Sequence, residues 1–225
     1  EIKKFKPLEI IIINNKSQVN NTNDTIKYLN ISEKKNAATN RNYGASEARG
    51  DFLLFIDNDV LIDSEYIYNN FVNAKIKHDL IFGMYSEINN NIDFLNHFQN
   101  KIQMYRTLEG NMFSTSHFLI NKETFKNLNG FNEELDSYED CEFYHRCIHE
   151  KVNSFFDKKF LGTHLKKHTL KTLLKDYYVK ASDAIYIRTK FPLIFKNTNY
   201  KTIGFKSKLY FLFFPFFSFI VIASF

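Results

Sequence analysis

The stretch NAATNRNYGASEARGDFLLFIDND, residues Asn36–Asp59, decides the fold class. Its first half predicts a helix over Asn36–Ala48 with small residues along one side, and Gly50 follows as a stop signal. Its second half, Phe52–Asp57, is an apolar run that ends on an acid, which is typical of a strand covered on both faces. A helix followed closely by a fully buried strand predicts part of a βαβ unit in an open α/β sheet.

Strands and helices alternate on both sides of this stretch. We expect further strands at Glu9–Asn14, Leu80–Tyr85, His117–Asn121 and Val152–Phe156, and helices at Ser64–Lys77, Asp93–Leu108, Lys122–Leu128, Ser137–Glu150 and Thr169–Lys190. Short apolar runs joined by short links predict a sheet that is mostly parallel. Because no repeat or linker interrupts residues 1–165, we expect one domain there.

Charge is distributed unevenly along the chain. The 225 residues carry a formal net charge of +5 with a pI near 9.0, an average that is typical of a nucleic-acid binder. Residues 1–150 nevertheless carry a net charge of −6, and residues 151–225 one of +11. Since the basic residues adjoin the apolar end and not the acidic part, we expect no nucleic-acid partner. Two Cys among 225 residues exclude a disulfide scaffold.

The chain ends in the uncharged run LYFLFFPFFSFIVIASF, Leu209–Phe225. A membrane-spanning helix needs about 20 apolar residues, with about 17 as the lower limit, so we expect a transmembrane helix to begin here. A buried C-terminal core helix is the alternative. Basic residues before a span favour the cytoplasmic side, which predicts a cell-membrane protein with its globular part in the cytoplasm. We therefore divide the chain into a domain at 1–168, a basic juxtamembrane helical segment at 169–208 and the apolar segment at 209–225.

Two acids follow the buried strand, Asp57 and Asp59. In an extended backbone, residues two apart point to the same side, so both carboxylates could face one point at the carboxyl end of the sheet. Two carboxylates beside a diphosphate suit a hard cation such as Mg²⁺ or Mn²⁺. The alternative is that Asp and Asn simply favour the turn after a strand.

A second acidic pair, Glu139-Asp140, lies at the start of the helix expected at Ser137–Glu150. A carboxylate at the positive end of a helix dipole stays ionised, as a general base must be. Ser137 and Asp140 also have the spacing of a capping box, which predicts a purely structural role. The two roles are compatible.

Histidines and cysteines offer weaker candidate sites. His145 and His149 are four apart, as are His164 and His168, and such pairs can bind Zn²⁺ when they lie on one helix. No further ligand spacing completes a zinc site. Cys141 and Cys147 match no metal or redox motif, and we expect buried, reduced thiols.

Taken together, these residues resemble family 2 glycosyltransferases. Residues 36–59 are similar to the family's core signature, in which an Arg-Asn-x-Gly helix and an Ala-x-Gly turn precede a strand ending in Asp-x-Asp. The stretch NLNGFNEELDSYEDCEFYHR, residues 127–146, resembles the family's Gly-Phe-Asp-Glu loop, its Glu-Asp pair and the Arg seven residues after Glu139. The order and the separations of these motifs match over roughly Leu8–His168.

The resemblance implies a GT-A fold, a Rossmann-like αβα sandwich, and transfer of a sugar from a nucleotide-diphosphate donor with inversion. It implies that Asp59 ligates Mn²⁺ or Mg²⁺, that Asp57 holds the ribose and the metal shell, and that Asp140 is the general base, oriented by Glu139. It also implies that Arg41 and Asn15 lie on the nucleotide side and that His164 contacts the diphosphate or the metal. Gly130 and Phe131 would belong to the loop near the acceptor and the donor sugar. A base on one face of the sugar and a stabilised leaving group on the other is what in-line displacement needs.

The chain departs from the family pattern at two places. The family's Asp-Asp-Gly-Ser after the strand at Glu9–Ile13 is here Asn14-Asn15-Lys16-Ser17, and Asn132 replaces an acid of the loop. The family's first strand and its following helix would lie before Glu1, so we expect a fragment.

We predict a membrane enzyme that extends a lipid-linked or surface polysaccharide. The alternatives are a non-catalytic scaffold with the same domain, or a nucleotidyltransferase of similar fold.

Overall fold

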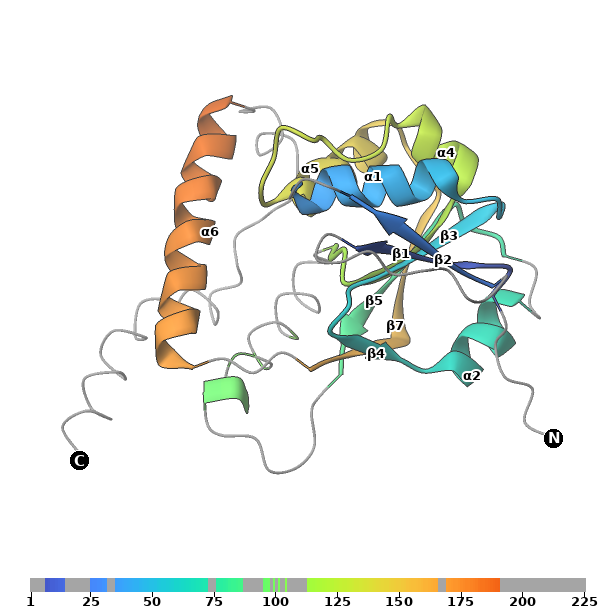
Figure 1. Ribbon diagram of the computed structural model, residues 1–225, viewed down its shortest axis with the longest axis horizontal. Coiled ribbons are helices and arrows are strands. Elements are labelled where there is room, and N and C mark those ends of the chain that lie inside the picture. Colours follow the sequence, from blue (N-terminus) through green and yellow to red (C-terminus); the bar gives the residue numbers. More distant parts are fainter. Residues whose placement is uncertain are drawn as a thin grey trace.

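The computed structural model describes residues 7–14, 25–31, 35–72, 76–86, 95–97, 99, 101, 104, 113–165 and 169–190 (Figure 1). Its strands are β1 (Ile10–Asn14), β2 (Ile26–Asn30), β3 (Phe52–Ile56), β4 (Val60–Ile62), β5 (Leu80–Tyr85), β6 (His117–Asn121) and β7 (Ser154–His164). Its helices are α1 (Ala37–Glu47), α2 (Ser64–Ile67) with the π-helical turn η1 (Tyr68–Val72), α4 (Lys122–Asn127), α5 (Glu139–His149) and α6 (Leu170–Lys190).

Most of the elements predicted from the sequence are present within these residues. β5 and β6 have the predicted bounds, and β1, β3, α1, α4, α5 and α6 differ by two residues or fewer at each end. The helix expected at Ser64–Lys77 is shorter, since α2 and η1 end at Val72. Most of Asp93–Leu108 lies outside the described residues.

The strands form two sheets, and the larger one is mixed. β1 and β2 pair in parallel, while the other five strands lie in the order β3-β6-β5-β7-β4. In this larger sheet only β5 and β7 pair in parallel, so the expectation of a mostly parallel sheet was wrong. The physical reason is that a strand buried on both faces has the same apolar sequence whichever way it runs.

Both faces of the larger sheet are covered, as an αβα sandwich requires. Leu80 and Phe82 of β5 point into a core shared with α1, α4 and α5, whereas Ile81 between them points into a second core with α2 and η1. β6 alternates in the same way, with Leu119 on the α2 side. This period of two is the geometry of a pleated strand. In Figure 1, α1, α4 and α5 lie together on one side of the sheet and α2 on the other.

The two-stranded sheet is attached to the domain through α1. A Cβ added at Gly44 would lie 3.4 Å from Cδ1 of Ile13, so the missing side chain lets the helix approach β1 closely. On the other side of the same helix, Ala38 and Ala45 are buried in the main core. The small-residue stripe predicted for this helix therefore serves close packing on both sheets.

Two glycines make room for a buried histidine between β5, β6 and β7. A Cβ at Gly83 would lie 1.9 Å from the Phe160 carbonyl oxygen, and one at Gly162 would lie 2.5 Å from the His117 ring. β5 has a register irregularity against β7 at the same place, between Phe82 and Met84. The ring of His117 thus occupies volume that side chains would fill in an ordinary strand pair.

The C-terminal part of the chain is described only as far as α6. No helix within the described residues is long and apolar enough to cross a membrane. The predicted span at Leu209–Phe225 lies outside those residues and stays a prediction, as do the three domain boundaries.

Candidate active site

Several strands place their ends at one edge of the larger sheet. β3, β5 and β7 run in the same direction, so Asp57, Tyr85 and His164 lie at their carboxyl ends. The amino end of the antiparallel β6 reaches the same edge, because His117 pairs with Ile56. In open α/β sheets, ligands bind outside the carboxyl ends of the strands. This edge is therefore the candidate site.

The Asp57-Asn58-Asp59 segment forms a turn at this edge and does not remain extended. The Asp57 N–H donates to the Ser116 carbonyl at 2.8 Å, and the Leu165 N–H donates to the Asp59 carbonyl at 2.7 Å. The backbone turns at Asn58 and Asp59, so the expectation of two carboxylates on one side of an extended strand was wrong. Asp57 pairs with Arg41, whereas Asp59 lies 3.4 Å from Nε2 of His164. This arrangement is compatible with a role of Asp57 and Asp59 in binding a metal. It is equally compatible with the ordinary preference of Asp and Asn for turns.

Arg41 joins the two acidic pairs that the sequence singled out. Its guanidinium lies 2.8 Å from Oδ1 of Asp57 and 2.7 Å from Oε1 of Glu139, and its side chain is 17% exposed. Burial works against this charge, but the two carboxylates outweigh it and raise the pKa of Arg41. Arg41 also lies 5.7 Å from the centre of the Phe131 ring, within cation–π range. One side chain of α1 thus fixes the distance between the end of β3 and the start of α5.

Glu139 and Asp140 lie in the first turn of α5, where the helix dipole favours negative charge. Glu139 is 8% exposed, and burial together with the charge of Asp140 raises its pKa, although Arg41 opposes this shift. Asp140 is only partly buried, and its Oδ1 accepts a hydrogen bond from the Cys141 N–H at 2.8 Å.

The capping-box interpretation of Ser137 and Asp140 was wrong. The N-cap of α5 is Tyr138, which has a left-handed backbone with φ of 60° and makes no side-chain capping bond. The helix begins one residue too late for Ser137 to be its cap. Asp140 is therefore a first-turn carboxylate and not the partner in a capping box.

Gly130 and Phe131 lie in a loop, residues 128–135, that α1 and α5 hold from two sides. Asn42 of α1 accepts a hydrogen bond from the Phe131 N–H at 2.8 Å and donates one to the Phe131 carbonyl at 2.9 Å. Gly130 has φ of 61°, and a Cβ there would lie 2.5 Å from Oδ1 of Asn42. The Phe131 ring lies 4.7 Å from that of Phe143, centre to centre, in the core.

Arg146 holds the same loop from α5, a role that the sequence argument did not assign. It donates to the Leu128 carbonyl and, at 2.7 Å, to the Gly130 carbonyl. Glu142, one turn earlier, pairs with it through two contacts of 2.6 and 2.7 Å. The i,i+4 spacing of Glu142 and Arg146 is a sequence signal for the ion pair, but nothing local predicts the two loop carbonyls.

The other predicted candidates have mixed outcomes. Cys141 and Cys147 are buried free thiols, as predicted. His164 ends strand β7, so the helical pair with His168 was wrong, and His168 itself lies outside the described residues, as does Asn15. In the part of the chain that the structure describes, no group of three or more His, Cys, Asp or Glu could hold a metal ion.

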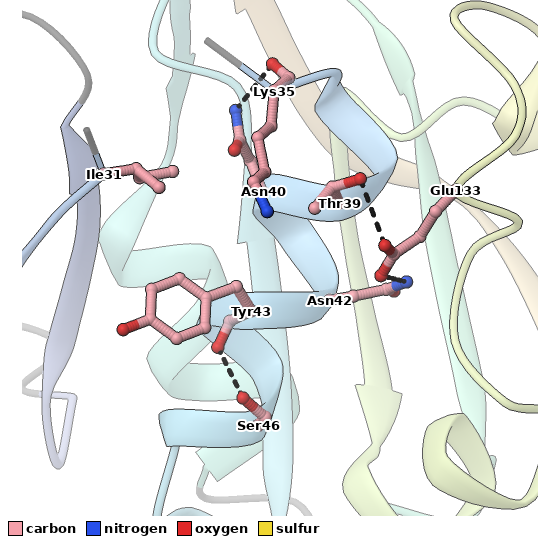
Figure 2. A pocket seen from close by; sticks show the side chains of 8 residues that line it. All are labelled: Ile31, Lys35, Thr39, Asn40, Asn42, Tyr43, Ser46 and Glu133. Carbon is pink, nitrogen blue, oxygen red and sulfur yellow. Dashed lines mark hydrogen bonds between the residues drawn. The ribbon is translucent and has the colours of Figure 1, made fainter. Parts of the chain in front are cut away.

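A separate pocket of about 450 Å³ lies on the outer side of α1 (Figure 2). It is lined by Ile31, Lys35, Thr39, Asn40, Asn42, Tyr43, Ser46 and Glu133. Glu133 accepts hydrogen bonds there from Thr39 and Asn42, at 3.2 and 2.9 Å. Arg41 and Tyr43 are two residues apart on a helix and point to opposite sides, so this pocket and the carboxylate site use different faces of α1.

Comparison with known proteins identifies the family. The model of the family described as "Glycosyl transferase family 2" matches residues 2–152. The chain belongs to this family. No curated protein matches the chain significantly.

Solved structures of similar fold include other glycosyltransferases. The mannosyltransferase PcManGT from Pyrobaculum calidifontis, solved with GDP-Man and Mn²⁺, has a TM-score of 0.52 at 13% identity over 72% of this chain and 49% of its own. TarS from S. aureus has a TM-score of 0.49 at 17% identity over 82% of this chain and 35% of its own. This family 2 chain spans about half the length of the mannosyltransferase. Together with the family match, the likeness to the mannosyltransferase confirms the predicted GT-A fold.

Replacing Arg41 should destabilise this family 2 domain in a pH-dependent way. Without Arg41 the pKa of Glu139 rises further, so the folded state holds that proton more tightly than the unfolded state does. The stability that such a group supplies is present at low pH and is lost as pH rises through the raised pKa. We expect Arg41→Gln to lower the free energy of unfolding by about 2 kcal/mol at neutral pH, and by clearly less near pH 4, where Glu139 begins to protonate in either state.

Urea unfolding at the two pH values measures this difference. The control is Arg49→Gln, which removes an arginine whose side chain is 67% exposed and whose partner is Glu9, 3.3 Å away. We expect this control to change stability by less than about 1 kcal/mol. An equal loss for Arg41→Gln at both pH values would contradict the electrostatic account.

Proposed function

We propose that the protein transfers a sugar, with inversion, from a nucleotide-diphosphate sugar to an acceptor that is a lipid-linked or surface polysaccharide. The observation that carries the proposal is the double contact of Arg41, at 2.8 Å to Asp57 and 2.7 Å to Glu139. Through it, the end of β3 and the start of α5 face each other across one guanidinium. In an in-line displacement the leaving group and the general base must lie on opposite sides of the reacting carbon, so the site needs two facing sets of side chains.

Asp140 is the group that we assign to proton abstraction. It is partly exposed at the site, lies in the first turn of α5, and is next to Glu139, which Arg41 holds. In the proposed reaction, the acceptor hydroxyl gives its proton to the Asp140 carboxylate while its oxygen bonds to the anomeric carbon. The bond from that carbon to the phosphate oxygen breaks, and its electron pair leaves with the nucleoside diphosphate.

Asp59 and His164 are the residues that we assign to a divalent cation, Mn²⁺ or Mg²⁺. Their side chains approach to 3.4 Å and are 35% and 23% exposed, so an oxygen and a nitrogen donor lie together at the sheet edge. A cation of this kind often takes only one or two protein carboxylates and completes its shell with substrate phosphates. When bound, it would neutralise charge on the diphosphate leaving group. Asp57, held by Arg41, is assigned to the ribose side of that shell.

The comparisons support the donor class in general terms. The mannosyltransferase of similar fold was solved with GDP-Man, and a TarS structure with UDP.

The membrane is the location that we propose for the acceptor. Helix α6 has exposed apolar side chains at intervals of four residues, Leu170, Leu174 and Tyr178, and Lys171 and Lys175 lie next to them. An apolar stripe beside lysines suits the surface of an anionic bilayer. This fits the expected location on the cytoplasmic side of the cell membrane.

The general-base assignment predicts a specific defect in Asp140→Asn. The variant should keep its affinity for the donor but lose transfer by at least about 100-fold, because an amide cannot accept the proton. Donor binding by calorimetry and release of nucleoside diphosphate by the full-length protein measure the two effects. Glu150→Gln, an exposed acid just past the other end of α5, is the matched control and should transfer normally. Retained transfer in Asp140→Asn would instead favour the non-catalytic scaffold.

The metal assignment predicts that Asp59→Ala loses metal-dependent turnover. Titration of Mn²⁺ into the protein with nucleoside diphosphate present should give a markedly weaker affinity for Asp59→Ala and for His164→Ala. Asp63→Ala, which removes a capping acid of α2, is the control and should bind Mn²⁺ as the wild type does. Unchanged Mn²⁺ affinity in Asp59→Ala would overturn the assignment.

The membrane proposal predicts that the full-length protein floats with vesicles that contain anionic lipid. Exchanging Leu174 and Tyr178 for Glu should weaken the association of residues 1–190 with such vesicles, and added salt should weaken it further. The pair Lys122→Glu and Lys126→Glu on α4 changes charge on a different helix and serves as the control. Equal flotation of the α6 variant and the parent chain would contradict a role for this face.

A further inference from the structure

Tyr85 lies at the middle of the candidate active site and has no role so far. It is the last residue of β5, the central strand of the larger sheet, and it pairs with Gly162 of β7. Its ring packs edge-on against the rings of His164 and His117, at centre-to-centre distances of 5.7 and 6.1 Å. Tyr85 therefore lies between the strand ends that carry the cation candidates and the buried histidine beneath the site.

The Tyr85 hydroxyl makes a polar contact at this edge. Its oxygen lies 3.2 Å from Oγ of Ser114. Burial raises the pKa of the phenol, the hydroxyls of Ser114 and Ser116 oppose this, and the charges of Asp57 and Asp140 raise it further. The phenol is therefore neutral near pH 7.

A hydrogen-bonded chain in the core supports this hydroxyl pair. His117 Nε2 lies 3.1 Å from the Phe160 carbonyl, which can only accept, so this nitrogen carries the proton. Burial lowers the pKa of His117, and the neutral ring then accepts at Nδ1 from the Ser116 hydroxyl, 2.9 Å away. The Ser116 N–H donates to Oγ of Ser114 at 3.3 Å. The His117 ring thus fixes the Ser116 hydroxyl as a donor, while between Tyr85 and Ser114 either hydroxyl can donate.

The chain ends on two hydroxyl groups that keep hydrogen-bonding capacity. A hydroxyl offers one donor and two acceptor positions, and the contacts named above use only part of those on Tyr85 and Ser114. A rigidly supported polar pair at the bottom of a ligand site is suited to bind a ligand hydroxyl, since removing that hydroxyl would leave the pair unsatisfied.

We propose that Tyr85, positioned by Ser114, determines specificity by hydrogen bonding to a hydroxyl of the sugar that is transferred. The proposal rests on the proposed function and deepens it. In that reaction the sugar ring must lie between the leaving diphosphate and the base, and the Tyr85 ring packs 5.7 Å from the ring of His164, which we assigned to the cation beside that diphosphate. A sugar with its hydroxyl at the matching position is then favoured over an epimer that turns this hydroxyl away.

The test compares Tyr85→Phe with the wild type in the full-length protein. The donors are UDP-glucose, UDP-galactose, UDP-N-acetylglucosamine and GDP-mannose, and kcat/KM is measured for each. We expect Tyr85→Phe to reduce the preference for the best donor over its competitors at least tenfold, and Ser114→Ala to reduce it in the same direction. Tyr66→Phe is the control, because it also removes a tyrosine hydroxyl from a hydrogen bond, here with Asp157.

The outcomes separate this inference from the function on which it rests. A wild type that transfers none of the four sugars would contradict the proposed function. A wild type with a clear preference that Tyr85→Phe leaves within twofold would overturn the role of Tyr85. A Tyr85→Phe variant that alters only KM for the acceptor would also overturn the role of Tyr85. Thermal unfolding of the variant shows whether a fall in all four rates reflects only lost stability.

Discussion

The ion pairs of Arg41 are the interaction on which the site depends. Two carboxylates that are far apart in the sequence, Asp57 after β3 and Glu139 at the start of α5, lie close together and would repel each other without a cation between them. The guanidinium has a planar fork that can donate to both at once. Because Arg41 sits on α1, and α1 packs on both sheets through Gly44 and Ala45, the site geometry is tied to the packing of the whole domain.

The positions of the acidic residues could be predicted from the sequence, because each depends on a local rule. Asp57 follows an apolar run of strand length, and Glu139 and Asp140 precede a helical pattern. The bridge between them could not be predicted from spacing, since 98 residues separate Arg41 from Glu139. The family resemblance supplied the order of the motifs, and the structure supplies their contacts. Tyr85 stood in a predicted strand, but no motif marked it.

Two strands that were not predicted from the sequence, β4 and β2, and the length of a third, β7, share a physical reason. β4 has only three residues, too few for a periodic pattern, and it is held by pairing with the end of β7. β7 was predicted only at Val152–Phe156, but the strand extends over Ser154–His164, where it pairs with β5 and β4. β2 is a short segment of both polar and apolar residues, and its strand structure depends on pairing with the parallel strand β1. In each case a partner strand distant in sequence decides the structure.

The loop at residues 128–135 is held by side chains that bind its main chain, and this has an evolutionary consequence. Asn42 binds the main chain of Phe131, Asn36 binds the carbonyls of Glu133 and Leu135, and Arg146 binds those of Leu128 and Gly130. Contacts to the backbone do not depend on the exposed side chains of the loop, so a position such as Glu134, whose side chain is 65% exposed, can be exchanged without breaking them. Asn132, where the family pattern has an acid, is half-buried, and its Oδ1 accepts a hydrogen bond from the Glu134 N–H at 3.0 Å. Selection can therefore alter what this loop recognises while the scaffold around it stays constant.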